Sequence, residues 1–119
     1  MKNSKIMDLS LNFSLRSIQL YKELLNEKEF IISKQFLRSA TSVGTNVFEA
    51  SAASSRKDFE NKMAIASKEA RESYYWLVLL RESNLVNARV DVQIKDIKNI
   101  INVLTAIVKT TRQSLQSKE

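Results

Sequence analysis

Residues 33–50 read SKQFLRSATSVGTNVFEA, and the spacing of their apolar residues is the clearest indication of the fold class. Its core apolar positions follow one another at intervals of four, three, four and three residues: Phe36, Ala40, Val43, Val47 and Ala50. These intervals place the side chains on one face of an α-helix and do not fit the two-residue period of a β-strand. The sequence therefore predicts a helix over about residues 30–53 that buries one face.

Gly44, the single glycine of the chain, lies in the middle of this predicted helix. A glycine inside a helix costs about 1 kcal/mol relative to alanine. Its neighbours are small residues such as Ser42 and Thr45, which indicates that another helix approaches closely, from the same chain or from a neighbouring subunit. A ligand contact with the backbone at Gly44 is the alternative interpretation.

Three further segments show helical periodicity, over about residues 8–26, 55–83 and 88–116. The segment 8–26 has a broad apolar face made by Leu11, Leu15, Ile18 and Leu25 with the flanking Phe13, Tyr21 and Leu24. The segment 55–83 has its apolar face at Phe59, Met63, Ala66, Ala70, Leu77 and Leu80. The segment 88–116 has its apolar face at Ile94, Ile97, Ile101, Leu104, Val108 and Leu115. Short polar connectors make successive helices antiparallel. The sequence therefore predicts an all-α, up-down-up-down four-helix bundle, with residues 1–119 forming a single domain.

Composition excludes several classes of enzyme. The 119 residues contain no proline, cysteine or histidine, so disulfides, thiolate zinc sites and Ser-His-Asp triads are impossible. Glu69 and Glu72 form a pair of the kind that holds magnesium, but the sequence has no second pair to complete such a site. We therefore predict no catalytic residue, no metal site and no cofactor, and hence no enzymatic activity.

The chain shows neither a signal peptide nor a membrane span. Its longest apolar run, residues 74–80, has seven residues, whereas a transmembrane helix needs about 20. We expect a cytoplasmic protein without a membrane partner.

The last predicted helix carries a basic ridge. Its four cations fall within about 100° of one another on a helical wheel: Lys95, Lys98, Lys109 and Arg112. With 19 basic against 13 acidic residues the chain has a net charge of +6, and such a ridge, repeated around an oligomer, would neutralise the phosphates of RNA or DNA. Plain solvation of a charged outer face is the alternative, because Asp91 lies on the same arc.

Two predicted helices, 30–53 and 55–83, present polar faces to each other. The members of this polar network are Gln35, Arg38, Asn46 and Glu49 on one helix and Lys62, Glu69 and Glu72 on the other. Antiparallel packing brings Arg38 level with Glu69 and Glu72, and charge-assisted hydrogen bonds between them would fix the helix register. Solvated surface charges are the alternative interpretation.

Apolar surface in excess of what one small bundle buries predicts contacts between subunits. The residues predicted to make these contacts are Leu37, Gly44, Phe48, Ile100, Val103 and Ile107. A thick internal core is the alternative.

The stretch 33–50 resembles the signature of bacterial four-helix-bundle proteins encoded in intervening sequences of large-subunit ribosomal RNA genes. The similarity continues through AIASKEA at residues 64–70 and YWL at residues 75–77, and Phe48 departs from it where a smaller or polar residue is usual. The resemblance implies a homo-oligomeric bundle, a pentameric ring, without enzymatic activity. The family is similar to the accessory protein of diversity-generating retroelements, a basic pentamer that binds nucleic acid and a reverse transcriptase. We therefore predict an RNA- or DNA-binding homo-oligomer, with a protein-binding scaffold as the alternative.

Overall fold

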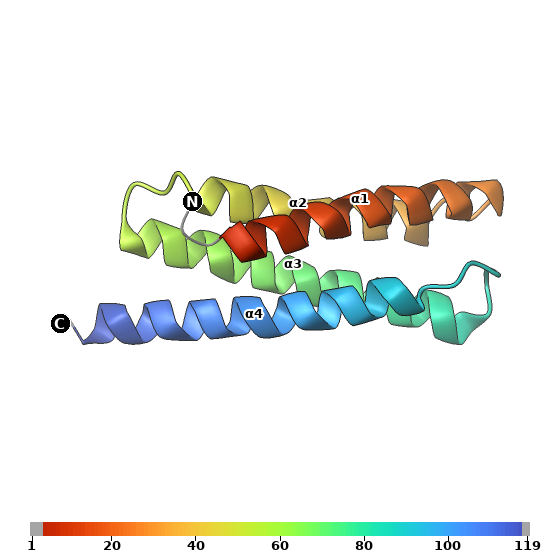
Figure 1. Ribbon diagram of the computed structural model, residues 1–119. Helices are drawn as coiled ribbons and strands as arrows, with labels where there is room; N and C mark the ends of the chain where they lie inside the picture. The colour runs from red at the N-terminus through yellow and green to blue at the C-terminus, as the bar shows by residue number, and fades with distance from the viewer. Residues whose placement is uncertain (1–3, 118–119) are drawn as a thin grey trace.

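The computed structural model describes residues 4–117, most of which lie in four α-helices. The helices are α1 (Ser4–Asn26), α2 (Ile32–Ala50), α3 (Arg56–Ser83) and α4 (Asp91–Gln116). They form an elongated bundle of 52 × 23 × 21 Å, and residues 4–117 contain no strand (Figure 1). The predicted all-α, four-helix architecture is confirmed.

The helices contact one another around a closed ring: α1 with α2, α2 with α3, α3 with α4, and α4 with α1. The connectors after α1 and after α3 lie at one end of the bundle, and the connector between α2 and α3 lies at the other (Figure 1). Glu27 joins the connector after α1 to the connector after α3, because its carboxylate accepts hydrogen bonds from the backbone N–H groups of Asn87 and Ala88.

Local signals explain where α2 and α3 begin. Ser55 is the N-cap of α3, and its hydroxyl accepts from the Asp58 N–H at 3.0 Å. Glu29 serves α2 from one turn before the helix, where its buried carboxylate accepts from the N–H groups of Ile31, Ile32 and Ser33. Burial alone raises the pKa of Glu29, but these backbone donors outweigh it and hold the pKa below its usual value.

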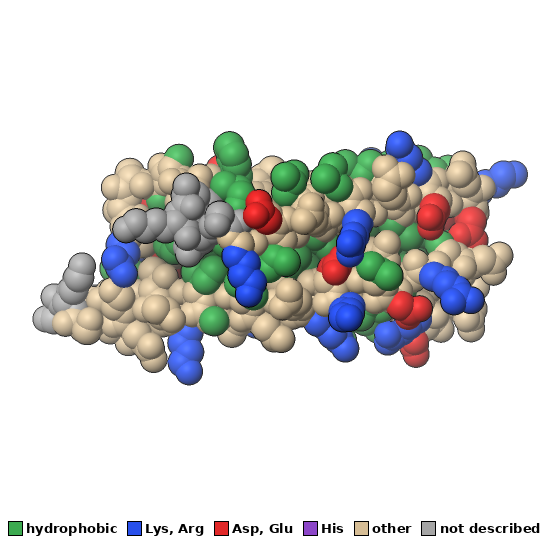
Figure 2. Space-filling model, in the orientation of Figure 1, with side chains coloured by type: hydrophobic (Ala, Val, Ile, Leu, Met, Phe, Trp, Pro, Cys, Tyr) green, Lys and Arg blue, Asp and Glu red, His purple; other side chains and the backbone are tan. Residues whose placement is uncertain are grey.

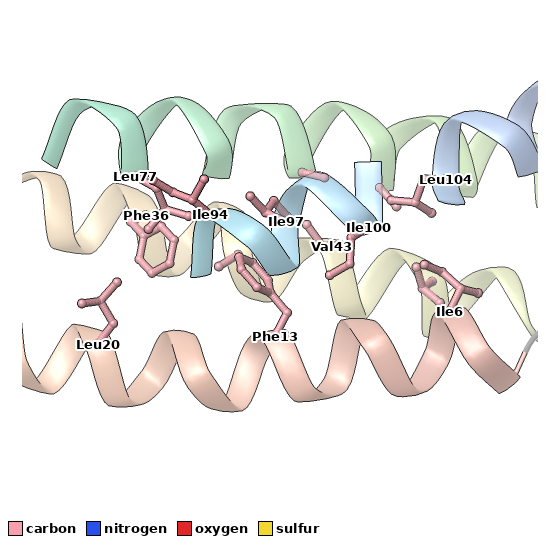
Figure 3. Close-up of a cluster of buried hydrophobic side chains, with 14 of the residues drawn as sticks. Ile6, Phe13, Leu20, Phe36, Val43, Leu77, Ile94, Ile97, Ile100 and Leu104 are labelled. Carbon is pink, nitrogen blue, oxygen red and sulfur yellow. The ribbon is translucent and has the colours of Figure 1, made fainter. Parts of the chain in front are cut away.

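The core fills the space between the helices (Figure 3). The five predicted positions of α2 are all buried, as are most of those predicted for α3 and α4. Phe13 of α1 meets Phe36 of α2 edge to face, with ring centroids 6.3 Å apart.

The predicted core face of α1 is wrong in part: the flanking residues Phe13 and Leu24 are buried, but the main stripe is not. Leu11, Leu15 and Ile18 are 56%, 53% and 37% exposed. The buried face instead contains two serines among larger apolar residues: Ile6, Ser10, Phe13, Ser17, Leu20 and Leu24. Ser10 and Ser17 are tolerated there because each hydroxyl donates to a carbonyl of its own helix, so neither hydroxyl is left without a partner.

The small residues of α1 and α2 allow these helices to approach closely. A Cβ atom on Gly44 would lie 3.1 Å from the Ser14 hydroxyl oxygen and 3.7 Å from the Ser10 carbonyl oxygen. The close approach predicted at Gly44 therefore occurs, and it comes from α1 of the same chain.

The predicted subunit contact at Ile100 is also wrong. Ile100 is 1% exposed and belongs to the core of its own bundle. Val103 and Ile107 are partly buried and pack against that core. The apolar surface of α4 is wide because it faces both α1 and α3, which corresponds to the thick core described as the alternative.

Candidate nucleic-acid and subunit interfaces

The basic ridge lies on the outer side of α4, where Lys95, Lys98, Lys109 and Arg112 are all exposed. Figure 2 shows basic side chains recurring along the α4 side of the molecule. Within residues 4–117, neither Lys95 nor Lys109 forms an ion pair. Both charges are therefore available to an anionic partner.

The other two ridge cations have partners on α3. The Lys98 ammonium lies 5.6 Å from the centroid of the Tyr74 ring, a cation–π contact that leaves its charge in place. The Arg112 Nε atom donates to Glu60, whose side chain is only 8% exposed, whereas that of Arg112 is 59% exposed. Glu60 therefore offsets one of the four ridge charges.

The polar network between α2 and α3 contains the predicted ion pairs. The guanidinium of Arg38 donates to Glu69 at 3.3 Å and also to Glu72. The Lys62 ammonium donates to Glu49 at 3.2 Å. These contacts join the two helices at two levels.

Other predicted members of the polar network act within α2. The side-chain oxygen of Gln35 accepts from the Arg38 Nε atom at 3.5 Å. The Asn46 amide donates to the Ser42 carbonyl oxygen at 2.8 Å, so the structure does not bring Asn46 into the bonds between helices. These two amides orient groups on α2 and do not bridge to α3.

Trp76 joins the network from one turn beyond Glu72. Its indole N–H donates to the Glu72 carboxylate at 3.0 Å. This bond is the largest influence that lowers the pKa of Glu72; burial opposes it, and Arg38 adds to it. The hydrogen bond to Glu72 in turn raises the pKa of Arg38, so the pair stays ionised.

An apolar face remains uncovered on the outer side of α1 and α2. We define the α1–α2 apolar face as Leu11, Leu15 and Ile18 of α1 together with Phe48 of α2, which is 66% exposed. Figure 2 shows apolar side chains along this edge of the bundle. Of the other residues predicted to contact a second subunit, Leu37 is partly buried on the same helix as Phe48.

A groove of about 340 Å³ runs between α3 and α4. We define the α3–α4 groove by its polar lining residues, Ser67, Arg71, Thr105, Lys109, Arg112 and Gln113. It brings two ridge residues, Lys109 and Arg112, together with Arg71 of α3.

Residues 2–109 match the family model described as 23S rRNA-intervening sequence protein. The chain belongs to this family. It is also similar to a crystal structure from Bacteroides thetaiotaomicron described as a protein with unknown function from the S23 ribosomal protein family, with 46% identity and a TM-score of 0.85. That similarity covers 92% of this chain and 99% of the other. No curated protein matches the chain.

The family assignment made from residues 33–50 is thus confirmed. In this member of the intervening-sequence family, residues 4–117 hold no cluster of acidic side chains that could bind a metal ion. None of the helices in the same range is both long and apolar enough to cross a membrane.

The sequence pattern did not identify three residues that lie where helices of this family member meet. Arg71 lies on α3, outside the helix that carries the basic ridge, so only the packing of α3 on α4 reveals its place beside Lys109. Ser39 and Ser73 form a buried hydroxyl–hydroxyl bond of 2.9 Å across α2 and α3. Their small size at core positions was the available signal.

Proposed function

We propose that this protein is a non-enzymatic, cytoplasmic homo-oligomer that binds RNA, or another nucleic acid, through the basic side of its bundle. The observation that carries the proposal is the exposed row of cations on α4, of which Lys95 and Lys109 have no acidic partner within residues 4–117. Cations on one helix face favour phosphate backbones without requiring a base sequence.

The descriptions of the relatives support a link with ribosomal RNA. The matching family model is described by an intervening sequence of 23S rRNA, and the solved relative is placed in an S23 ribosomal protein family. The net charge of +6 agrees in sign with such a partner.

Self-association is supported by the α1–α2 apolar face. Three of its four side chains are more than half exposed, and the three on α1 follow one another at intervals of four and three residues on one helix face. Exposed apolar side chains that share a face favour contact with another protein surface. We propose that this face, rather than Ile100, contacts a second copy in a ring, which the family resemblance makes a pentamer. Each ring would then repeat the basic side once per subunit.

Retention of labelled RNA on a filter, measured from low to moderate salt, tests nucleic-acid binding. The unmodified protein should retain RNA at low salt and release it steeply as salt rises, because bound phosphates release counterions. Absence of retention even at low salt would contradict the proposal.

A variant with Lys95→Gln, Lys98→Gln and Lys109→Gln should lose most of this retention. Arg112 stays in place because its removal would leave the buried Glu60 without its partner. The matched control carries Lys28→Gln, Lys34→Gln and Arg89→Gln, which remove the same charge from other exposed positions. Equal losses in both variants would show that the α4 ridge has no special role.

A protein-binding scaffold is the second candidate. Phe30, Ile31 and Leu85 are exposed on the connectors at one end of the bundle. Such apolar positions favour a protein partner over a phosphate backbone. Self-association without RNA retention would support this second function.

A further inference from the structure

The α3–α4 groove differs from the rest of the basic side because its cations converge from two helices. Arg71 comes from α3, and Lys109 and Arg112 come from α4. The remaining polar groups of the groove, the hydroxyls of Ser67 and Thr105 and the amide of Gln113, are all able to donate hydrogen bonds. Donors of this kind suit the oxygens of a phosphate group.

The charge balance of the groove leaves it positive. Glu60 forms an ion pair with Arg112, and no other acidic residue within residues 4–117 forms an ion pair with a cation of the groove. The other carboxylates of α3 nearest in sequence, Glu69 and Glu72, bind Arg38 of α2 on the opposite edge of the helix. Three cations and one carboxylate therefore leave two positive charges uncompensated in the groove.

The groove cations keep donors free for a ligand. The Arg112 bond to Glu60 uses Nε, and residues 4–117 supply no acceptor for its two Nη atoms. The Arg71 Nη2 atom donates to the Thr105 hydroxyl at 3.2 Å, which holds the guanidinium across the groove and orients that hydroxyl. Lys109, the third groove cation, forms no ion pair within residues 4–117.

We infer that the α3–α4 groove is a phosphate-binding site that holds the sugar–phosphate backbone of RNA. This inference rests on the proposed function and places its main contact between the helices. From Thr105 to Arg112 the groove extends about 10 Å along α4, so several donors meet one short run of backbone. The lining residues include no aromatic ring for base stacking, so the groove contacts phosphate and sugar, and such contacts carry no sequence information directly.

The test compares two variants that remove equal charge. The groove variant carries Arg71→Gln and Lys109→Gln, whereas the control carries Arg89→Gln and Lys28→Gln in the connectors at one end of the bundle. With a short labelled RNA at fixed salt, the groove variant should bind on the order of tenfold more weakly, and the control should bind nearly as well as the unmodified protein. The slope of log affinity against log salt should fall by about 0.7 for each RNA phosphate that the groove variant no longer neutralises.

Inorganic pyrophosphate serves as a second probe because it has phosphates without bases. In the unmodified protein it should shift the backbone amide NMR signals of residues 64–71 and 105–113 more than those of α1 and α2, and this pattern should disappear in the groove variant. Thermal unfolding of both variants checks that each remains folded.

The two proposals fail in different ways. If RNA binds and both variants weaken it equally, the groove inference is overturned while nucleic-acid binding stands. If the unmodified protein retains no RNA, the proposed function fails, and pyrophosphate then decides the groove: absence of localised shifts overturns it as a phosphate site.

Discussion

Glu29 shows how one carboxylate can hold the start of a helix that has no side-chain cap of its own. Ile31, at the N-cap position of α2, makes no capping hydrogen bond through its side chain. The Glu29 carboxylate takes over that task for three backbone N–H groups. Because those donors favour the ionised form, the pKa of Glu29 is lower in the folded chain than in the unfolded chain.

Glu29 should therefore stabilise the fold in a pH-dependent manner. A lowered pKa gives stability that is present above the unfolded value of 4.5 and is lost as pH falls through the folded pKa. Glu29→Gln should cost about 1–2 kcal/mol near neutral pH, as loss of a cap does, and the difference from the unmodified chain should shrink in acid. Urea unfolding of both chains, near neutral pH and again in acid below pH 4.5, measures this difference in stability. Glu23→Gln, at an exposed position of α1, is the control and should change stability little.

Gly44 offers a second test at the level of single atoms. In Gly44→Ala, alanine favours the helix by about 1 kcal/mol relative to glycine, but its Cβ would lie only 3.1 Å from the Ser14 hydroxyl oxygen. In a chain that also carries Ser14→Ala, this contact disappears, so Gly44→Ala should then stabilise the fold. Gly44→Leu should destabilise both backgrounds, because the Ser10 carbonyl is backbone and cannot turn away. Urea unfolding of the four variants measures these effects, and a stabilising Gly44→Leu would contradict the close packing of α1 on α2.

At the level of elements, periodicity predicted the helices better than it predicted their faces. In α2 one apolar stripe exists, and the sequence identifies its buried residues correctly. In α1 two stripes compete: the stripe of Leu11, Leu15 and Ile18 stays exposed, whereas the stripe that includes Ser10 and Ser17 is buried, with both hydroxyls bonded to carbonyls of α1. Residue type alone does not reveal which serines have their hydroxyls satisfied by the helix backbone.

The α2–α3 ion pairs were predictable because register follows from a short connector. Arg38, Glu69 and Glu72 come level once the two helices run antiparallel. The α3–α4 groove was not predictable in the same way, since it depends on how far α4 is rotated about its own axis. That rotation is fixed by the burial of both Ile97 and Ile100. The sequence pattern predicted Ile97 in the core and Ile100 at a subunit contact, so it did not predict this rotation.

Arg38 and Glu72 should be measurably coupled across α2 and α3. Arg38 is half exposed, so the coupling should be about 0.5–1 kcal/mol and should weaken with salt. A double-mutant cycle with Arg38→Met and Glu72→Gln, read by urea unfolding, measures it. Lys62 and Glu49, exposed to a similar degree, provide the comparison pair. A coupling independent of salt would contradict a largely solvated network.

For the whole molecule, opposite sides of the bundle have different surface chemistry. The apolar face lies on α1 and α2, whereas cations lie along α4 (Figure 2) and line the α3–α4 groove. Subunits joined through the first side keep the second side accessible. Self-association and phosphate binding are therefore separable by mutation.

Leu15→Glu should dissociate the oligomer while leaving each bundle folded. Leu15 is 53% exposed at the centre of the apolar stripe, so a charge there costs little in the monomer and much in a buried subunit contact. Light scattering should report a multiple of 13.6 kDa for the unmodified protein and a single chain for the variant. Val92→Glu is the matched control, since Val92 is 56% exposed on α4, away from that face, and its mass should not change. A 13.6 kDa particle for the unmodified protein, at concentrations used for RNA binding, would show that the α1–α2 apolar face has no second copy as its partner.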